Sequence, residues 1–121
     1  MLFRSFPVRR KGELRAYLAS FAEILTQCAD VRRAGAAALD LAHVACGRLD
    51  GYWEFGLKPW DVAAGTLLVQ EAGGLVGDPD GGERQLECGD IVAANPKLFR
   101  QLLGVLARRH DTRGAAAAAE R

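Results

Sequence analysis

The order in which helical and strand-like patterns follow one another constrains the fold of this chain more than any other feature. Apolar residues recur at helical spacing from Gly12 to Cys28, and an alanine-rich helical run extends from Ala36 to Cys46. The later segments alternate, with strands at Gly51–Gly56, Leu75–Gly77 and Ile91–Ala94 and helices from Pro59 to about Ala72 and from Pro96 to about Arg109. This alternation predicts an α/β structure in which helices and a sheet form layers.

Glycine, proline and polar clusters mark the boundaries of these elements. Gly47 and Gly73 follow two of the helical runs, as glycine often does at helix ends. Pro59 lies in the first turn of a helix, where its missing N–H costs no intrahelical hydrogen bond. The connecting piece Asp30–Arg33 fits a short strand, and Asp78–Gly82 is a turn by composition.

The length allows one ordinary domain. Of the 121 residues, half are apolar and about a quarter are charged, which is a globular composition. We expect this domain to cover residues 1–109. Residues 110–121 form a low-complexity, alanine-rich tail that we expect to be disordered.

The charge balance gives no bulk reason for binding to polyanions. The formal net charge is +1, so neither nucleic acid nor an anionic membrane is expected as a partner. Arg9, Arg10 and Lys11 are interpreted as a solvated cluster before a helix. The N-terminus lacks the apolar core of a secretory signal, and no segment is long and apolar enough to span a bilayer. We therefore expect a cytoplasmic protein.

The cysteine pattern argues against a small domain held together by disulfides or by zinc. Cys28, Cys46 and Cys88 are odd in number and lack CxxC spacing, which argues against a disulfide framework and a zinc site. We expect buried or half-buried thiols in a reducing compartment. His43, inside a helical run, is interpreted as a packed or surface histidine rather than a ligand.

Three features are candidates for chemistry. Asp61 falls in the first turn of a helix, where the macrodipole favours a carboxylate, and a fixed carboxylate is a natural magnesium ligand. Acidic residues are also common in first turns for helix stability alone. Glu54 could bind substrate hydroxyls from the end of a strand, or be an exposed strand glutamate. Gly35-Ala36-Ala37 opens a helix with bare amides, and is either an anion- or hydroxyl-binding corner or a plain turn.

Taken together, these features resemble the inositol monophosphatase family. The resemblance lies in Arg33–Ala42, in Gly47–Glu54, and in Trp60–Gly65, which reads Trp-Asp-Val-Ala-Ala-Gly. It continues through Leu68–Gly74, where Glu-Ala-Gly-Gly completes the family's second signature. The resemblance extends from about Phe6 to Leu106, nearly the whole chain.

The resemblance implies a fold and a role for each matching residue. It implies a layered α-β-α fold of the sugar-phosphatase type, with a mixed sheet flanked by helices. Asp61 matches an aspartate that ligates catalytic magnesium, and Glu54 matches a glutamate that binds a substrate ring hydroxyl. Gly35, Ala36 and Ala37 match a Gly-[Ser/Thr]-Ala corner that contacts substrate. Here Ala36 replaces the hydroxyl-bearing residue, so one side-chain hydrogen bond to substrate is absent.

The family's other metal ligands do not occur in this sequence. They belong to a Gly-Glu-Glu block and an Asp-Pro-x-Asp-Gly-[Thr/Ser] block in the amino-terminal half of the family's chain. Asp78-Pro79-Asp80-Gly81-Gly82 is one residue short and follows the Glu-Ala-Gly-Gly block, so it is rejected as a metal site. By the resemblance, Met1 lies just before the family's Gly-Phe-Pro segment, here Ser5-Phe6-Pro7. The chain is therefore expected to correspond to the carboxyl-terminal half of the fold.

Two functions remain open. The resemblance implies a Mg²⁺-dependent phosphomonoesterase acting on inositol 1-phosphate or a related small phosphorylated polyol or sugar. One aspartate holds magnesium weakly, so the chain alone is expected to have little or no activity, and to form a homodimer or pair with an amino-terminal half. The alternative is a non-catalytic interaction module, or a degenerate fragment, that keeps the fold without turnover.

Overall fold

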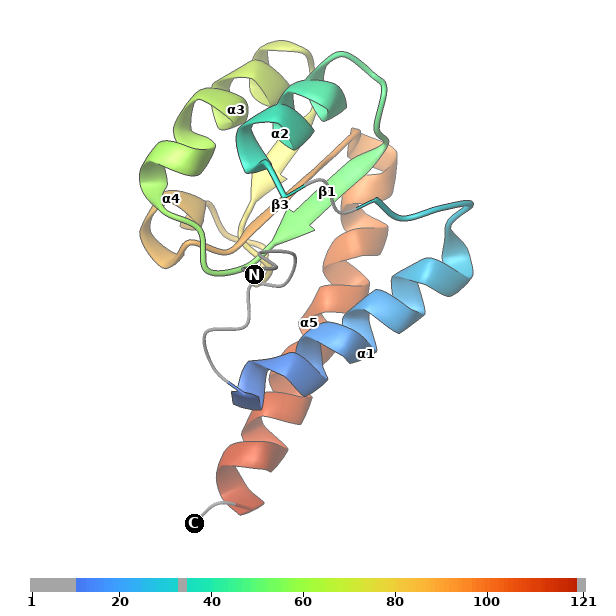
Figure 1. Cartoon of the computed structure of the whole chain (residues 1–121), viewed down its shortest axis with the longest axis vertical. Coiled ribbons are helices and arrows are strands. Elements are labelled where there is room, and N and C mark those ends of the chain that lie inside the picture. The colour runs from blue at the N-terminus through green and yellow to red at the C-terminus, as the bar shows by residue number, and fades with distance from the viewer. Residues whose placement is uncertain (1–10, 33–34, 120–121) are drawn as a thin grey trace, which may run out of the picture.

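The computed structural model describes residues 11–32 and 35–119, and within these ranges helices flank a single three-stranded sheet (Figure 1). The expected basic pair Arg9 and Arg10 and the Ser5-Phe6-Pro7 segment lie outside the described residues. In chain order the elements are α1 (Lys11–Gln27), α2 (Ala37–Ala45), β1 (Gly51–Glu54), α3 (Pro59–Glu71), β2 (Leu75–Gly77), α4 (Gln85–Cys88), β3 (Ile91–Ala94) and α5 (Pro96–Ala119).

The last strand in the sequence is the central strand of the sheet. The strand order is β1-β3-β2, and β3 is antiparallel to both neighbours, with Ala94 opposite Gly51 on one side and Leu75 on the other. β1 and β2 therefore run in the same direction, and α3 connects them. The α/β class with flanking helices is confirmed. A mixed sheet was predicted, but the described strand pairings are all antiparallel. The reason is that β3 lies between β1 and β2, the two strands that α3 connects.

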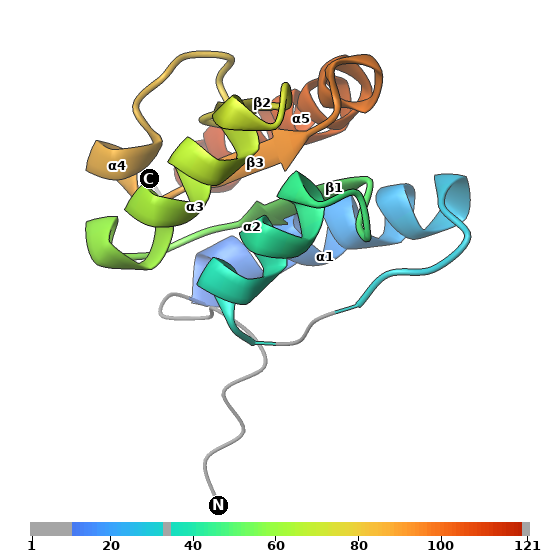
Figure 2. The same ribbon diagram turned by 90° about the horizontal axis from the view of Figure 1, so that it is seen from above.

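Alternating side chains on β3 explain why helices cover both faces of the sheet (Figure 2). Val92 and Ala94 belong to a core formed with α1 and α5, whereas Ile91 and Ala93 belong to a core formed with α2 and α3. All four residues are fully buried. A strand buried on both faces reads as an uninterrupted apolar run, which is the pattern of this segment. The result is three layers, with the sheet in the middle.

The end of β1 is fixed against α1 by aromatic packing. Phe55, the residue after β1, is buried, and its ring meets that of Tyr17 edge-on with the centroids 5.9 Å apart. Trp53 lies on the same face of the sheet and packs near Phe21, with ring centroids 6.4 Å apart. These contacts hold the loop that leads from β1 into α3.

α2 and α3 pack closely because a glycine lies at their contact. A Cβ atom added to Gly65 of α3 would come within 2.5 Å of the Leu41 side chain of α2. Leu41 itself is completely buried. Gly65 therefore belongs to the helix contact, and the alanine-rich composition of α2 suits the same close approach.

Most predicted elements are present, and the differences have local causes. The described part of Asp30–Arg33 forms no strand, since residues 30–32 have no strand partner. The short helix α4 was not predicted, because four residues are too few to show helical periodicity. α5 continues to Ala119, beyond the predicted end at Arg109 and into the expected tail, as the high helix propensity of alanine favours.

The thiols differ from expectation. Cys28, Cys46 and Cys88 are all free, as predicted for a chain without a disulfide framework, but all three are exposed rather than buried or half-buried. Each lies at or just beyond a helix end, where the chain leaves the core. Among the described helices, none is long and apolar enough to cross a membrane.

Candidate functional site

The carboxylate of Asp61 serves the start of α3. Asp61 is the third residue of this helix, and its Oδ2 atom accepts a hydrogen bond from the backbone N–H of Lys58, the N-cap residue, at 3.0 Å. This is the carboxylate half of a capping box. Lys58 cannot supply the other half, because an ammonium group has no acceptor. Asp61 is half-buried, and its Oδ1 atom has no hydrogen-bond partner among the described residues.

Glu54 likewise bonds to the backbone beside it. It is the last residue of β1, is half-buried, and its Oε1 atom accepts the N–H of Phe55 at 3.0 Å. The same loop is tied to the start of β3, since Asp90 accepts the N–H of Gly56 at 3.1 Å. The backbone N–H of Leu57 also donates to the carbonyl of Gly89 at 2.9 Å. The β1–α3 loop is thus held from both sides.

The Gly35–Ala37 segment forms the start of α2. Gly35 has a φ of 77°, in the left-handed region that favours glycine, and Ala36 is the N-cap of α2. Ala36 is exposed and, having only a methyl group, makes no side-chain cap. A Ser or Thr at this position would accept one of the unpaired N–H groups of the first turn. The amides at the start of α2 therefore lack the partner that the family's hydroxyl would supply.

The fold brings these three features to one end of the molecule. β1 runs back alongside α2, and α3 turns back again after β1. The starts of α2 and α3 and the end of β1 consequently lie at the same end of the layers (Figure 1). However, no cluster of three or more His, Cys, Asp or Glu side chains able to hold a metal occurs in the described part of the chain. Asp61 is a single carboxylate, and the residues present do not form a magnesium site by themselves.

Asp78 has a structural task in the loop after β2. Its buried carboxylate accepts backbone N–H groups of Asp80 at 2.8 Å, Gly82 at 3.1 Å and Arg84 at 3.0 Å. Burial raises the pKa of Asp78, but these hydrogen bonds and the nearby Arg84 charge outweigh it, so the pKa is lowered from its ordinary value. The hydrogen bonds from three amides to this carboxylate give a structural reason to reject Asp78-Pro79-Asp80 as a metal site.

The Cys88 thiol shows no sign of activation. Local burial of the sulfur and the charges of Asp90 and Asp78 raise the pKa of Cys88, against the opposing effect of its hydrogen bond to the Asp90 carbonyl. A raised pKa leaves less thiolate at neutral pH, and the thiolate is the reactive form.

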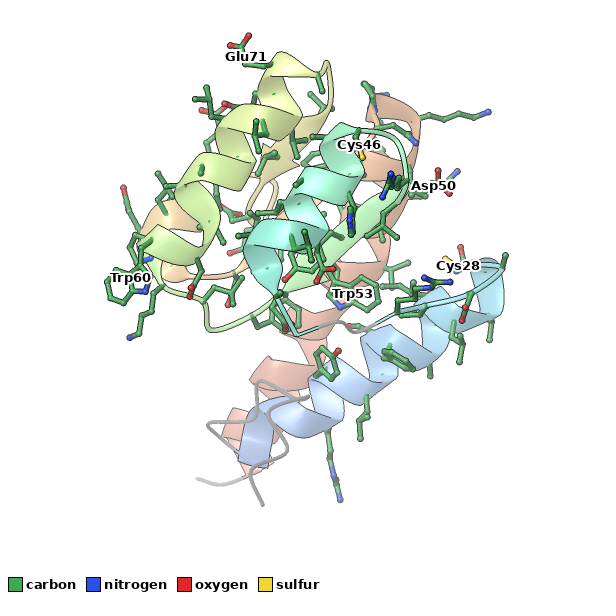
Figure 3. All side chains as sticks on the ribbon, turned by 45° about the horizontal axis from the view of Figure 1, so that its top comes forward. Cys28, Cys46, Asp50, Trp53, Trp60 and Glu71 are labelled. Atoms are coloured by element: carbon green, nitrogen blue, oxygen red, sulfur yellow. The ribbon has the colours of Figure 1, made fainter. Side chains whose placement is uncertain are left out.

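Sequence reasoning missed an exposed apolar surface on α3. The side chains of Trp60, Leu67 and Leu68 are 77%, 58% and 50% exposed. Figure 3 shows Trp60 and Glu71 at opposite ends of α3, both pointing away from the sheet. The signal was present in the sequence, because α3 carries no charged residue from Val62 to Val69. A helix that is apolar on all sides is typical of a buried position.

Comparison with known proteins establishes the family. Residues 2–112 match the model of the inositol monophosphatase family, and this chain therefore belongs to that family. Among similar proteins are the "Putative Nus factor SuhB" of Neisseria meningitidis, 54% identical over 84% of this chain, and the "Nus factor SuhB" of Pseudomonas aeruginosa, 55% identical over 85%. The chain spans only 39% of the length of each of these relatives.

Solved structures agree with the fold. The extragenic suppressor protein suhB of Bartonella henselae superposes with a TM-score of 0.78 and 42% identity, over 84% of this chain and 38% of that one. An inositol monophosphatase from Anabaena gives a TM-score of 0.71 and 48% identity, over 74% of this chain and 37% of the other. The layered arrangement of helices and sheet is thus that of proteins in this family.

These relatives overturn one expectation. The prediction that nucleic acid is not a partner is wrong, because relatives about half identical to this chain are named Nus factors, a name that belongs to transcription. The prediction relied on net charge, and a total of +1 does not describe how charges are distributed over a surface.

Proposed function

We propose that this chain is a non-catalytic interaction module that keeps the inositol monophosphatase fold, in the Nus-factor role for which its relatives are named. One observation carries the proposal: Asp61 and Glu54 both accept backbone N–H groups at the ends of their own elements. A carboxylate with this task stabilises the fold whether or not a metal is bound. Both residues are therefore useful to the fold even in a protein that has no catalytic turnover.

The exposed surface supports an interaction role. Monomeric proteins rarely expose large contiguous apolar patches, and such patches mark interaction sites. Trp60, Leu67 and Leu68 expose half or more of their side chains on one helix. We propose that this surface is covered when the protein works, and that the chain self-associates. The proposed setting is the cytoplasm, where exposed thiols such as Cys28 and Cys46 stay reduced.

A second candidate is the phosphatase activity of the family. It is favoured by the Trp60–Gly65 block and by the shared end that holds the starts of α2 and α3. In this candidate Asp61 is a Mg²⁺ ligand through Oδ1, Glu54 binds a hydroxyl of inositol 1-phosphate or a related sugar phosphate, and Gly35, Ala36 and Ala37 contact the substrate. Mg²⁺ prefers six oxygen ligands, so most of them would have to come from beyond the residues described.

Phosphate release tests the two candidates against each other. The purified chain is assayed with inositol 1-phosphate across a magnesium titration, beside Asp61→Asn, and magnesium binding is followed by calorimetry. We expect no release above the buffer rate and no saturable heat for either protein. Magnesium-dependent release that Asp61→Asn abolishes would contradict the proposal and support the phosphatase. Asn retains an acceptor for the Lys58 N–H, so the variant is expected to fold.

The Nus-factor role needs a separate test. The chain and its Asp61→Asn variant are expressed in Escherichia coli lacking its own Nus factor of this family. Equal restoration of growth by both proteins is the expected result, since the proposed role does not use a metal. Restoration by the wild type alone would favour catalysis, and failure of both proteins at normal expression would count against the Nus-factor role.

A further inference from the structure

The start of β1 and the start of α5 lie side by side, at the end of the layers away from Asp61. Gly51 of β1 is paired with Ala94, the last residue of β3, and the backbone N–H of Asn95 donates to the carbonyl of Asp50 at 3.3 Å. Because α5 begins directly after β3, the loop between α2 and β1 runs next to the first turn of α5 (Figure 1).

Three exposed cations come from these two segments, and we call them the basic cluster: Arg48, Lys97 and Arg100. Arg48 and Lys97 each lie three residues beyond the paired residues Gly51 and Ala94. Lys97 and Arg100 are neighbours on the surface of α5, since Cβ atoms three positions apart on a helix are separated by roughly 5–6 Å. Among the described residues, none of the three cations has an ion-pair partner.

The side of α5 that carries Lys97 and Arg100 faces away from the core. Leu98 and Leu102 point at β1, because a Cβ atom added to Gly51 would come within 3.1 Å and 2.8 Å of their side chains. At 3.6 residues per turn, Arg100 falls on the side of the helix opposite these two leucines, and Lys97 lies beside it. Both cations are therefore presented to solvent.

These two cations stand where a positive charge does not serve the helix. The first turns of α5 form the positive end of the helix dipole, which favours acidic residues, and the first turn contains none. The backbone N–H of Leu98 is already capped by the Asn95 side chain at 2.8 Å. An anion at this place would therefore bind the side chains of Lys97 and Arg100, and it would relieve the repulsion between like charges.

We infer that the basic cluster is a contact surface for the phosphate backbone of a nucleic-acid strand. This inference rests on the proposed Nus-factor role and names its surface. Unpaired Lys and Arg side chains bind phosphates and position a strand without reading its sequence. The formal net charge of +1 conceals such a surface, because acidic residues elsewhere in the chain cancel its charge in the total.

The acidic residues near this surface set the expected strength. Asp50 is exposed beside the cluster and opposes binding, whereas Glu71 lies apart from it at the end of α3 (Figure 3). Three phosphate contacts to a single strand correspond to a slope of about −2 in the logarithm of the association constant against that of the salt concentration. We therefore expect weak, sequence-independent binding that high salt abolishes.

Fluorescence anisotropy of a labelled single-stranded RNA of about twelve nucleotides tests this surface over a salt series from about 50 to 200 mM. Arg48→Gln, Lys97→Gln and Arg100→Gln should each raise Kd about fivefold to tenfold at the lowest salt, and each should make the salt slope shallower by about 0.7. Removing a cation from the start of α5 suits the helix dipole, so unfolding does not explain the loss.

Two further variants sharpen the test. Lys58→Gln removes the same charge from an exposed position at the opposite end of the layers, and it should leave Kd within about twofold of wild type. Asp50→Asn removes the carboxylate beside the cluster and should tighten binding, a gain that a damaged protein cannot give. Single-stranded DNA of the same length, titrated in parallel, should show the same losses because its backbone carries the same phosphates.

Three results would overturn the inference: no saturable binding at the lowest salt, an equal loss in Lys58→Gln and in the cluster variants, or losses confined to one of the two nucleic acids. Binding to anionic lipid vesicles without binding to either nucleic acid would overturn it as well. These readouts use neither phosphate release nor bacterial growth, so the proposed function and this inference fail separately.

Discussion

At the scale of single residues, the carboxylates that look available for chemistry are held by the backbone. Asp61 caps α3, Glu54 bonds beyond the end of β1, and Asp78 closes the loop after β2. The sequence places each of them correctly at an element boundary. It does not reveal their partners, because a boundary carboxylate has the same sequence signature whether it binds an amide or an ion.

Asp78→Asn is expected to lower the free energy of unfolding by about 1–3 kcal/mol at neutral pH, since three amides lose a charged acceptor. The pKa of Asp78 is lowered below 3.8 in the folded state, so its contribution is complete well above that value and is lost as pH falls through it. The free energy of unfolding of wild type, measured in urea, should therefore fall between about pH 5 and pH 3 more steeply than that of the variant.

Glu83→Gln is the matched control for this change. Glu83 lies in the same loop but is exposed, and the variant should keep both the stability and the pH profile of wild type. Parallel pH profiles for wild type and Asp78→Asn would contradict the role assigned to the Asp78 carboxylate.

At the scale of elements, the packing of α2 on α3 depends on one missing side chain. Leu41 occupies the space where a Gly65 side chain would lie. The small side chains of the alanine-rich run Ala36–Cys46 suit close packing, and the structure identifies the contact. The packing of β3 also explains why its sequence is an apolar run, since its two faces belong to two different cores.

Gly65→Ala is expected to destabilise the chain by about 1–3 kcal/mol through overpacking against Leu41. Gly104→Ala is the matched control: Gly104 lies in α5, a Cβ there meets nothing within 4 Å, and the change should stabilise by about 0.5–1 kcal/mol. Chemical denaturation of both variants gives the comparison. A neutral or stabilising Gly65→Ala would show that the two helices separate without cost.

At the scale of the whole molecule, three layers are built around β3, and one outer layer keeps an apolar outward surface. α1 and α5 cover one face of the sheet while α2 and α3 cover the other (Figure 2). Trp60, Leu67 and Leu68 of α3 are exposed because nothing in the described part of the chain lies over them. The chain spans 39% of the length of the relatives it matches. We therefore expect this outward surface to be covered by another part of an assembly.

Removing residues 110–121 is expected to leave the thermal unfolding midpoint nearly unchanged. Five of the twelve tail residues are alanine and the others are glycine or polar and charged residues, so the tail offers little apolar surface to bury. A chain that ends before Leu102 is the control, because it also loses Val105 and Leu106 from the core and should not fold. A large drop in the midpoint for the first truncation would show that the domain does not end at residue 109.

The sequence alone determined the family, through Trp60–Gly65 and Glu-Ala-Gly-Gly, and the bounds of β2 and β3. Periodicity and turn residues report the local backbone, which neighbouring residues largely set. Only the tertiary structure decided that β3 lies between β1 and β2, that Asp61 bonds to Lys58, and that the cysteines are exposed. Strand order, hydrogen-bond partners and burial depend on which distant segments meet, and no local pattern records that.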